Sequence, residues 1–196
     1  TLSQIDSYSD DPVPMLFQTG YLTIKGIDED SGDFILGIPN KEVERGFFQG
    51  LLPLCSGQSA MASRDFIREA AKLLREGNPE KFLEKLRAFL ADIPYELANK
   101  QPEIYFENNL YVIFKLLGFN VKAEYHTSSG RIDVVVKTSK YVYVMELKLN
   151  GSSEEAMRQI DGKGYSVPFS ADGRQVMKIG VNFSSETRTL ADWLIE

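Results

Sequence analysis

The strongest constraint on the fold comes from two apolar runs that follow each other closely, residues 131–137 and 141–149. Three polar residues join them, a length that suits a hairpin loop. Because side chains alternate across a strand, Glu146 and Lys148 share one face of the second run. Asp133 interrupts the first run in a similar way. If the two runs pair as a hairpin, Asp133 and Glu146 come close together at one end of the sheet.

Two carboxylates held side by side repel each other, and one takes up a proton unless a cation joins them. Mg²⁺ or Mn²⁺ suits such a pair, because hard cations prefer carboxylate oxygens and keep several waters. A water on the metal becomes a better nucleophile. Asp133 and Glu146 are therefore candidate metal ligands, and Lys148 is a candidate to orient the water or to stabilise charge on a phosphate. The alternative is a surface ion pair of Glu146 and Lys148 beside a solvated Asp133, because so short a pattern often occurs by chance.

Residues 105–183 resemble a PD-(D/E)xK nuclease-like domain, and more narrowly the domain at the C-terminus of bacterial AAA-ATPase-like proteins. Seven short segments carry the resemblance: the helix Tyr105–Tyr111 with Glu107, then Leu117–Phe119, Thr127, Gly130–Asp133, Met145–Leu149, Ala156–Ile160 and Tyr165. Ile132 stands where the name of the superfamily has proline, a position at which many members differ.

The resemblance implies that Asp133 and Glu146, together with the carbonyl of Leu147, hold Mg²⁺ or Mn²⁺, and that Lys148 assists the attacking water. It also implies an auxiliary acidic role for Glu107 and a contact role for Gln159 on the following helix.

Residues outside the acidic pair add weaker signals. Glu107 lies beside an apolar helix stripe, and a partner such as Arg131 or Lys148 is the alternative to a functional role. Gln159 and Lys163 are four residues apart and share a helix face that suits a nucleic-acid backbone or simply water. The lone His126 is interpreted as a surface or hydrogen-bonded residue. The helix stripe next to Glu107 consists of Leu110, Tyr111 and Phe114.

Charge is distributed unevenly along the 196 residues. The net charge is −6, and residues 1–50 with 9 acidic and 3 basic side chains account for all of it. A broad basic surface for duplex binding is therefore not evident. A local basic group, with Arg131 and Lys163 as candidate substrate contacts, could guide a phosphate backbone. The basic residues near the site are Lys115, Lys122, Arg131, Lys137, Lys140 and Lys148, of which Lys122, Lys137 and Lys140 are interpreted as ordinary decoration of solvated strands.

We divide the chain into three parts. Residues 1–57 are expected to be the end of an ATPase-like region, with a linker over 1–14, a strand-like run over 15–25, a hairpin over 21–38 and a helix from 41 to about 52. Residues 58–100 are expected to form a helical hairpin, 63–76 and 79–91. The chain starts at Thr1 without Met and has no P-loop motif. We therefore expect a fragment whose ATPase-like domain lies upstream.

Residues 101–196 are predicted to form an α/β domain with a restriction-endonuclease-like core, that is, a mixed central sheet flanked by helices. The expected order is a helix over 103–117, strands over 119–126, 131–137 and 141–149, a helix after Ser152 or Ser153 and a strand over 176–183. Residues 187–195 form a further edge strand or a short helix.

The function expected from these features is metal-dependent hydrolysis of phosphodiester bonds in nucleic acid, with DNA as the first substrate to consider. The rival is a non-catalytic module that binds nucleic acid or a protein partner and serves the ATPase-like domain. A purely structural scaffold is a third interpretation. No run of about 20 apolar residues predicts a membrane span, and a single Cys and a single His exclude an internal disulfide and a thiolate–imidazole zinc cluster. We expect a cytoplasmic protein, with a homodimer as one option.

Overall fold

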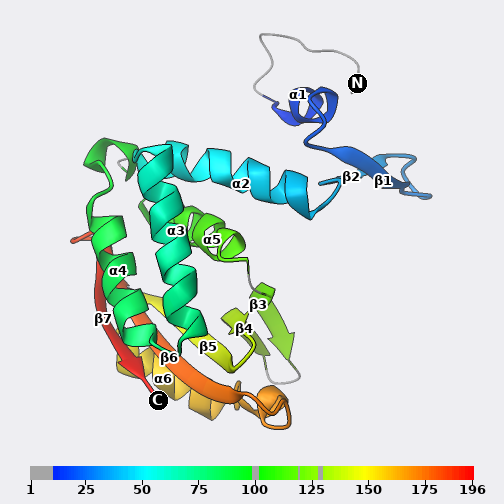
Figure 1. Ribbon diagram of the computed structural model, residues 1–196. Helices are drawn as coiled ribbons and strands as arrows, with labels where there is room; N and C mark the ends of the chain where they lie inside the picture. Colours follow the sequence, from blue (N-terminus) through cyan, green and yellow to red (C-terminus); the bar gives the residue numbers. More distant parts are fainter. Residues whose placement is uncertain (1–10, 99–101, 119, 128–129) are drawn as a thin grey trace. The chain divides into compact units, whose positions relative to one another are not determined.

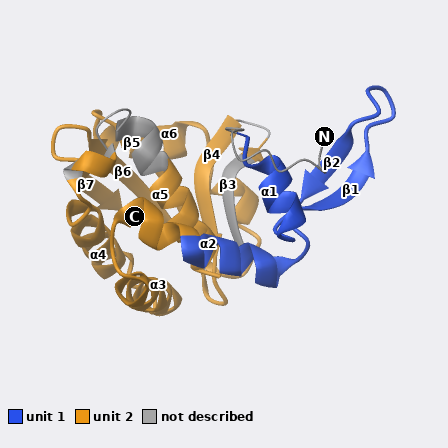
Figure 2. Ribbon diagram, turned by 90° about the horizontal axis from the view of Figure 1, so that it is seen from above, with its two compact units in different colours: residues 1–50 blue, residues 51–196 orange. Residues whose placement is uncertain are grey.

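The computed structural model describes residues 11–98, 102–118, 120–127 and 130–196, and gives the backbone alone for 95, 98, 102–107 and 120–125. The chain divides into two compact units, residues 1–50 and 51–196 (Figure 2). The three-part division made from the sequence is a finer one and stays a prediction. No helix in the described part of the chain has the length and hydropathy that a bilayer span requires.

The first unit contains a short helix, α1 (Val13–Gln18), and a two-stranded antiparallel sheet of β1 (Thr23–Ile27) and β2 (Phe34–Gly37). The predicted hairpin is confirmed, but the strand-like run over 15–25 is wrong in its first half. Pro14 lies in the first turn of α1, where its fixed φ favours a helix, and the carboxylate of Asp11 accepts a hydrogen bond from the Val13 N–H at 2.9 Å. The proline in the first turn and the hydrogen bond from Asp11 thus outweigh the apolar pattern that suggested a strand.

Three helices follow, α2 (Lys41–Ser56), α3 (Ala60–Arg75) and α4 (Pro79–Ala91). The predicted cap of α4 is confirmed, because the Asn78 side chain accepts from the N–H of Lys81 and Pro79 opens the helix. The rings of Phe66 and Phe89 stack with centroids 4.1 Å apart, which holds α3 against α4 as the expected helical hairpin.

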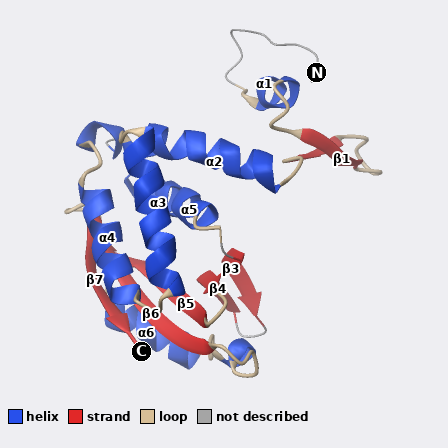
Figure 3. Cartoon of the chain, viewed as in Figure 1, coloured by secondary structure: helices blue, strands red, loops and turns tan. Residues whose placement is uncertain are grey.

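The remaining elements are the 3₁₀ helix η1 (Tyr95–Ala98), α5 (Pro102–Leu116), β3 (Asn120–Thr127), β4 (Gly130–Lys137), β5 (Tyr141–Leu149), α6 (Ser153–Gly162), the 3₁₀ helix η2 (Val167–Phe169), β6 (Gln175–Ser184) and β7 (Thr189–Ile195) (Figures 1 and 3). Five strands form one sheet in the order β3-β4-β5-β6-β7. Only β5 and β6 pair in parallel, and α6 makes the crossover between them. The mixed sheet flanked by helices confirms the predicted fold class, and residues 189–195 are a strand rather than a helix.

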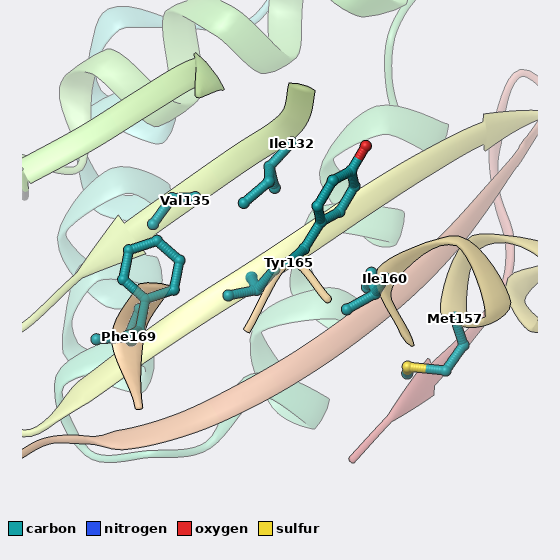
Figure 4. Packing of buried hydrophobic residues seen from close by; sticks show 8 residues of the cluster. Ile132, Val135, Met157, Ile160, Tyr165 and Phe169 are labelled. Atoms are coloured by element: carbon teal, nitrogen blue, oxygen red, sulfur yellow. The ribbon is translucent and has the colours of Figure 1, made fainter. Parts of the chain in front are cut away.

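The two faces of β5 pack against different helices. On one face the hydroxyl of Tyr143 donates to the carbonyl of Leu74 in α3 at 2.7 Å. Val142 and Val144 point to the other face and join a buried cluster with α6 and the segment that follows it. The cluster, part of which is labelled in Figure 4, comprises Ile132, Val135, Val142, Val144, Met157, Ile160, Tyr165 and Phe169. Glu146 and Lys148 continue the face of Val142 and Val144, as the alternation predicts.

Candidate active site

The predicted acidic pair lies where the ladder between β4 and β5 ends. Val134 pairs with Met145, so Asp133 and Glu146 are the next opposed positions along the two strands. The backbone N–H of Leu147 donates to Oδ2 of Asp133 at 2.9 Å. A side chain thus replaces the backbone of β4 as the partner of β5, and Asp133 is held beside Glu146.

The same hydrogen bond bears on the expected role of the Leu147 carbonyl. In an extended strand the N–H and the C=O of one residue point to the same edge. Since the Leu147 N–H points to Asp133, its carbonyl lies on the edge of β5 that carries the acidic pair. The position suits a backbone oxygen ligand beside two carboxylates.

Glu146 is almost completely buried, with 2% of its surface exposed. Its Oε1 accepts a hydrogen bond from the side-chain amide of Gln159 and lies 3.5 Å from Nζ of Lys148. Its Oε2 is buried and has no hydrogen-bond partner among the described residues. A buried carboxylate oxygen without a partner is costly, so this atom is placed as a ligand atom would be.

Burial and, to a smaller extent, the negative charge of Asp133 together raise the pKa of Glu146 to about 7, against the opposing effect of Lys148. The repulsion between two carboxylates that the sequence predicts contributes to this shift, but burial is the larger cause. A bound cation would remove the conflict by favouring the ionised form of both groups.

Lys148 and Gln159 complete the constellation. Oε1 of Gln159 accepts from Nζ of Lys148 at 2.5 Å, while the amide nitrogen of Gln159 donates to Glu146. One amide therefore bridges the carboxylate and the ammonium and fixes both. The Lys148 side chain is 29% exposed, so its charge can reach a bound phosphate. The structure thus brings together Asp133, Glu146, Leu147, Lys148 and Gln159.

The position of α6, which carries Gln159, depends on three residues that the sequence analysis did not single out. Gly180 of β6 is the parallel neighbour of Glu146, and a Cβ atom there would overlap the backbone of α6 at the Ser153 carbonyl. Asp192 of β7 accepts from the Ser153 N–H and from the amide of Asn182, both at 2.9 Å. The sequence signal was present, since Asn182 and Asp192 are polar residues with apolar neighbours on both sides, Val181 and Phe183 around the first and Ala191 and Trp193 around the second.

Asp133 and Glu146 supply two carboxylates to the site. Among the described residues, no group of three or more His, Cys, Asp or Glu side chains is suited to hold a metal ion. Two carboxylates, one of which has a buried oxygen without a partner among the described residues, and one backbone carbonyl fit Mg²⁺, which is usually bound through one or two carboxylates and keeps several waters. The residues present therefore fit a hard divalent cation, which prefers oxygen ligands.

The other predicted site residues are Glu107, Arg131 and Lys163. Glu107 lies in α5, but its side chain is outside the described residues. Arg131 is exposed at the start of β4, two residues before Asp133 and thus on the same strand face. Lys163 is the exposed C-cap of α6. Their roles as an auxiliary acid and as substrate contacts stay predictions.

The wider basic group is only partly gathered around the site. Lys137 pairs with Asp172 at 3.4 Å, at the end of β4 away from Asp133, and Lys140 is exposed in the turn after β4. Nζ of Lys115 lies over the ring of Tyr111, which is 45% exposed and therefore not part of a buried stripe. The Lys122 side chain is outside the described residues. His126 is exposed, as expected.

Comparison with known proteins agrees with this geometry. Residues 101–193 match the PD-(D/E)XK nuclease superfamily. The chain is also 31% identical over 191 residues to a protein of Azotobacter chroococcum mcd 1 described as an uncharacterized protein in the vnfD 5′ region. That match covers 93% of this chain but 37% of the relative, so the chain spans little more than a third of the relative's length. No solved structure matches the chain.

Proposed function

We propose that residues 101–196 form a divalent-metal-dependent nuclease domain that hydrolyses phosphodiester bonds of nucleic acid, DNA being the first candidate. The observation that carries the proposal is the buried Oε2 atom of Glu146, which has no hydrogen-bond partner among the described residues. Its neighbour Oε1 is fully engaged by Gln159 and Lys148. The hydrogen bonds to Oε1 thus orient the carboxylate of Glu146, and Oε2 is available to bind a metal ion. The superfamily match over 101–193 supports the same chemistry.

In this proposal Asp133, Glu146 and the Leu147 carbonyl hold Mg²⁺ or Mn²⁺. When bound, such an ion supplies a water of lowered pKa and neutralises charge on a phosphate oxygen. The ammonium of Lys148 stabilises the negative charge that develops on the phosphoryl oxygens, because Gln159 keeps it in place before the substrate arrives. Asp133 keeps β5 aligned through the Leu147 N–H. Arg131 and Lys163 are proposed to contact the nucleic-acid backbone.

The proposed cellular setting is that of a longer cytoplasmic polypeptide in which an ATPase-like domain precedes the nuclease domain. Two observations support a longer polypeptide: the chain spans 37% of its Azotobacter relative, and the net charge of −6 lies within residues 1–50, which suits a contact between domains. The ATPase-like nature of the preceding domain rests on the resemblance of residues 105–183 to the C-terminal domain of AAA-ATPase-like proteins. Formation of a homodimer is also part of this proposal.

The deciding experiment is cleavage of labelled single-stranded and double-stranded DNA and RNA with Mg²⁺ or Mn²⁺, by the wild type and by Lys148→Ala. We expect metal-dependent cleavage that falls about 100-fold or more in the variant. Lys140→Ala is the matched control, because Lys140 is an exposed lysine in the turn after β4, and it should cleave like the wild type.

Calorimetry separates the rival, a non-catalytic binding module, from the proposed enzyme. A nuclease site should bind Mn²⁺ in the wild type and lose that binding in Glu146→Gln, which keeps the shape of the side chain but removes the charge. Absence of Mn²⁺ binding by the wild type, together with absence of cleavage, would leave the binding module as the better assignment.

A further inference from the structure

The hairpin of the first unit presents an apolar face. In its register Ile24 pairs with Leu36 and Ile27 pairs with Phe34, with a bulge between Ile24 and Gly26. Residues three apart lie on opposite faces of a regular strand, but one extra residue at a bulge restores them to the same face. The bulge therefore gathers Ile24, Ile27, Phe34 and Leu36 on one side of the two strands.

This apolar face is largely open. The exposed fractions are 42% for Ile24, 59% for Ile27 and 53% for Phe34. Among the described residues 11–50, Phe48 alone is buried. A two-stranded sheet is marginally stable by itself and gains stability when a further layer covers its apolar face. Within the described residues of the first unit, the hairpin therefore has no layer that buries its apolar face.

The charged residues around this apolar face indicate what kind of surface would complement it. The turn that joins the two strands carries Asp28, Glu29, Asp30 and Asp33, whereas the strands contribute one cation, Lys25. Backbone hydrogen bonds from Ser31 and Asp30 hold the pKa of Asp28 below its usual value, which keeps this carboxylate charged. A surface with an apolar centre and a basic rim complements this pattern, whereas a second copy would meet like charge.

The size of the face favours a partner in the same polypeptide. Its partly exposed side chains offer on the order of 400 Å². Stable contacts between separate proteins bury about 1,200 Å² or more in total, but domains within one chain associate through interfaces from about 600 Å². Tethering supplies an effective concentration in the millimolar range, so a small contact suffices. The Azotobacter relative shows that a related protein has this additional length, since the match covers 37% of it.

We propose that the hairpin face formed by Ile24, Ile27, Phe34 and Leu36 is the docking surface for an additional domain of the same, longer polypeptide, whose contact surface has an apolar centre and a basic rim. The inference rests on the longer polypeptide proposed above, but not on nuclease chemistry, because none of these residues belongs to the candidate active site.

The test begins with the gene. The coding region that lies outside residues 1–196 is expressed as a separate protein, and its binding to the 196-residue chain is measured by calorimetry. We expect binding that weakens at high salt, because the acidic turn and a basic rim attract each other. Ile27→Lys and Phe34→Lys should each weaken binding at least tenfold, since each places a cation in the apolar centre. Leu54→Lys is the matched control, because Leu54 is an exposed leucine of the second unit, and it should bind like the wild type. Far-UV circular dichroism verifies that every variant is folded.

Four outcomes overturn the proposal. The gene encodes no further domain; the additional domain does not bind the wild-type chain; Ile27→Lys and Phe34→Lys bind it as the wild type does; or the face is already covered in the isolated chain. The last case is measured directly. If hydrogen exchange shows full protection of residues 24–36 before the additional domain is added, residues 51–196 cover the face. If analytical ultracentrifugation shows a dimer that depends on Ile27, a second copy covers it. Each of these results is distinct from a loss of DNA cleavage.

Discussion

Gly180 of β6 lies directly against Ser153 of α6, so close that a Cβ atom on Gly180 would overlap the Ser153 carbonyl. Gly180 is also the parallel neighbour of Glu146. The absence of a side chain at this one position therefore lets α6 approach the sheet beside the acidic pair. Through this approach the amide of Gln159 reaches both Glu146 and Lys148.

Gly180→Ala should destabilise the domain, because the added methyl group meets backbone atoms of α6 that cannot move independently. We expect a loss of about 1–3 kcal/mol in the free energy of unfolding, measured by urea titration, and a lower rate of cleavage. Gly162→Ala is the control, since a methyl group added at Gly162 would have no neighbouring atom within 4 Å. Equal stability of the two variants would show that α6 does not depend on this contact.

Gln159→Leu should separate activity from stability. The change removes the amide that bridges Glu146 and Lys148 while keeping much of the side-chain volume. We expect metal-dependent cleavage to fall roughly 10–100-fold, because the ammonium is no longer held in place. Arg158→Leu, at the exposed neighbouring position of α6, should cleave normally. A Gln159→Leu variant with full activity would refute the positioning role of this amide.

The raised pKa of Glu146 predicts how metal-free stability depends on pH. A glutamate titrates near 4.5 in the unfolded chain and at about 7 in the folded, metal-free site. Between these values the folded state binds more protons, so the contribution of Glu146 to stability falls as pH rises from about 4.5 to about 7. We expect a decrease of roughly 1–3 kcal/mol relative to Glu146→Gln, measured by denaturant titration in EDTA at several pH values. An equal pH dependence of the two proteins would contradict the raised pKa.

Addition of Mg²⁺ or Mn²⁺ should reverse this loss at neutral pH. A cation that binds the folded state stabilises it by mass action, and it binds best when Glu146 and Asp133 are ionised. The rise in melting temperature should therefore be larger at pH 7.5 than at pH 5. Glu155→Gln serves as the control because Glu155 is an exposed carboxylate on α6, and it should respond as the wild type does. A rise that is equal at both pH values would argue against carboxylate ligands.

Asp192→Ala should loosen the start of α6. The carboxylate of Asp192 accepts from the Ser153 N–H and the Asn182 amide, and its removal leaves both donors of a partly buried network without this partner. We expect a loss of about 1–3 kcal/mol in thermal or urea unfolding. Glu186→Ala, an exposed acid in the turn before β7, should change stability by less than about 0.5 kcal/mol. A loss of similar size in both variants would point to a general charge effect.

The sequence was most informative where local chemistry acts alone. Caps and turns located α4 and the hairpin between β4 and β5, and strand alternation placed Glu146 and Lys148 on one face. It failed at residues 13–18, where Pro14 and Asp11 favour a helix over the strand suggested by Leu16 and Phe17. The reason is that a short apolar run suits a helix or a strand equally well, and the flanking residues decide between them.

The candidate residues for the chemistry could thus be named from the chain alone, because carboxylates, a lysine and their strand spacing are local features of the sequence. Tertiary structure alone decided their environment. The burial of Glu146 and its unpartnered Oε2, the bridge made by Gln159, and the close contact of Gly180 with α6 all depend on segments far apart in the sequence meeting at one sheet. Burial and proximity arise from packing, so no pattern of residue types could give the burial that contributes most to the raised pKa of Glu146, or the position of α6.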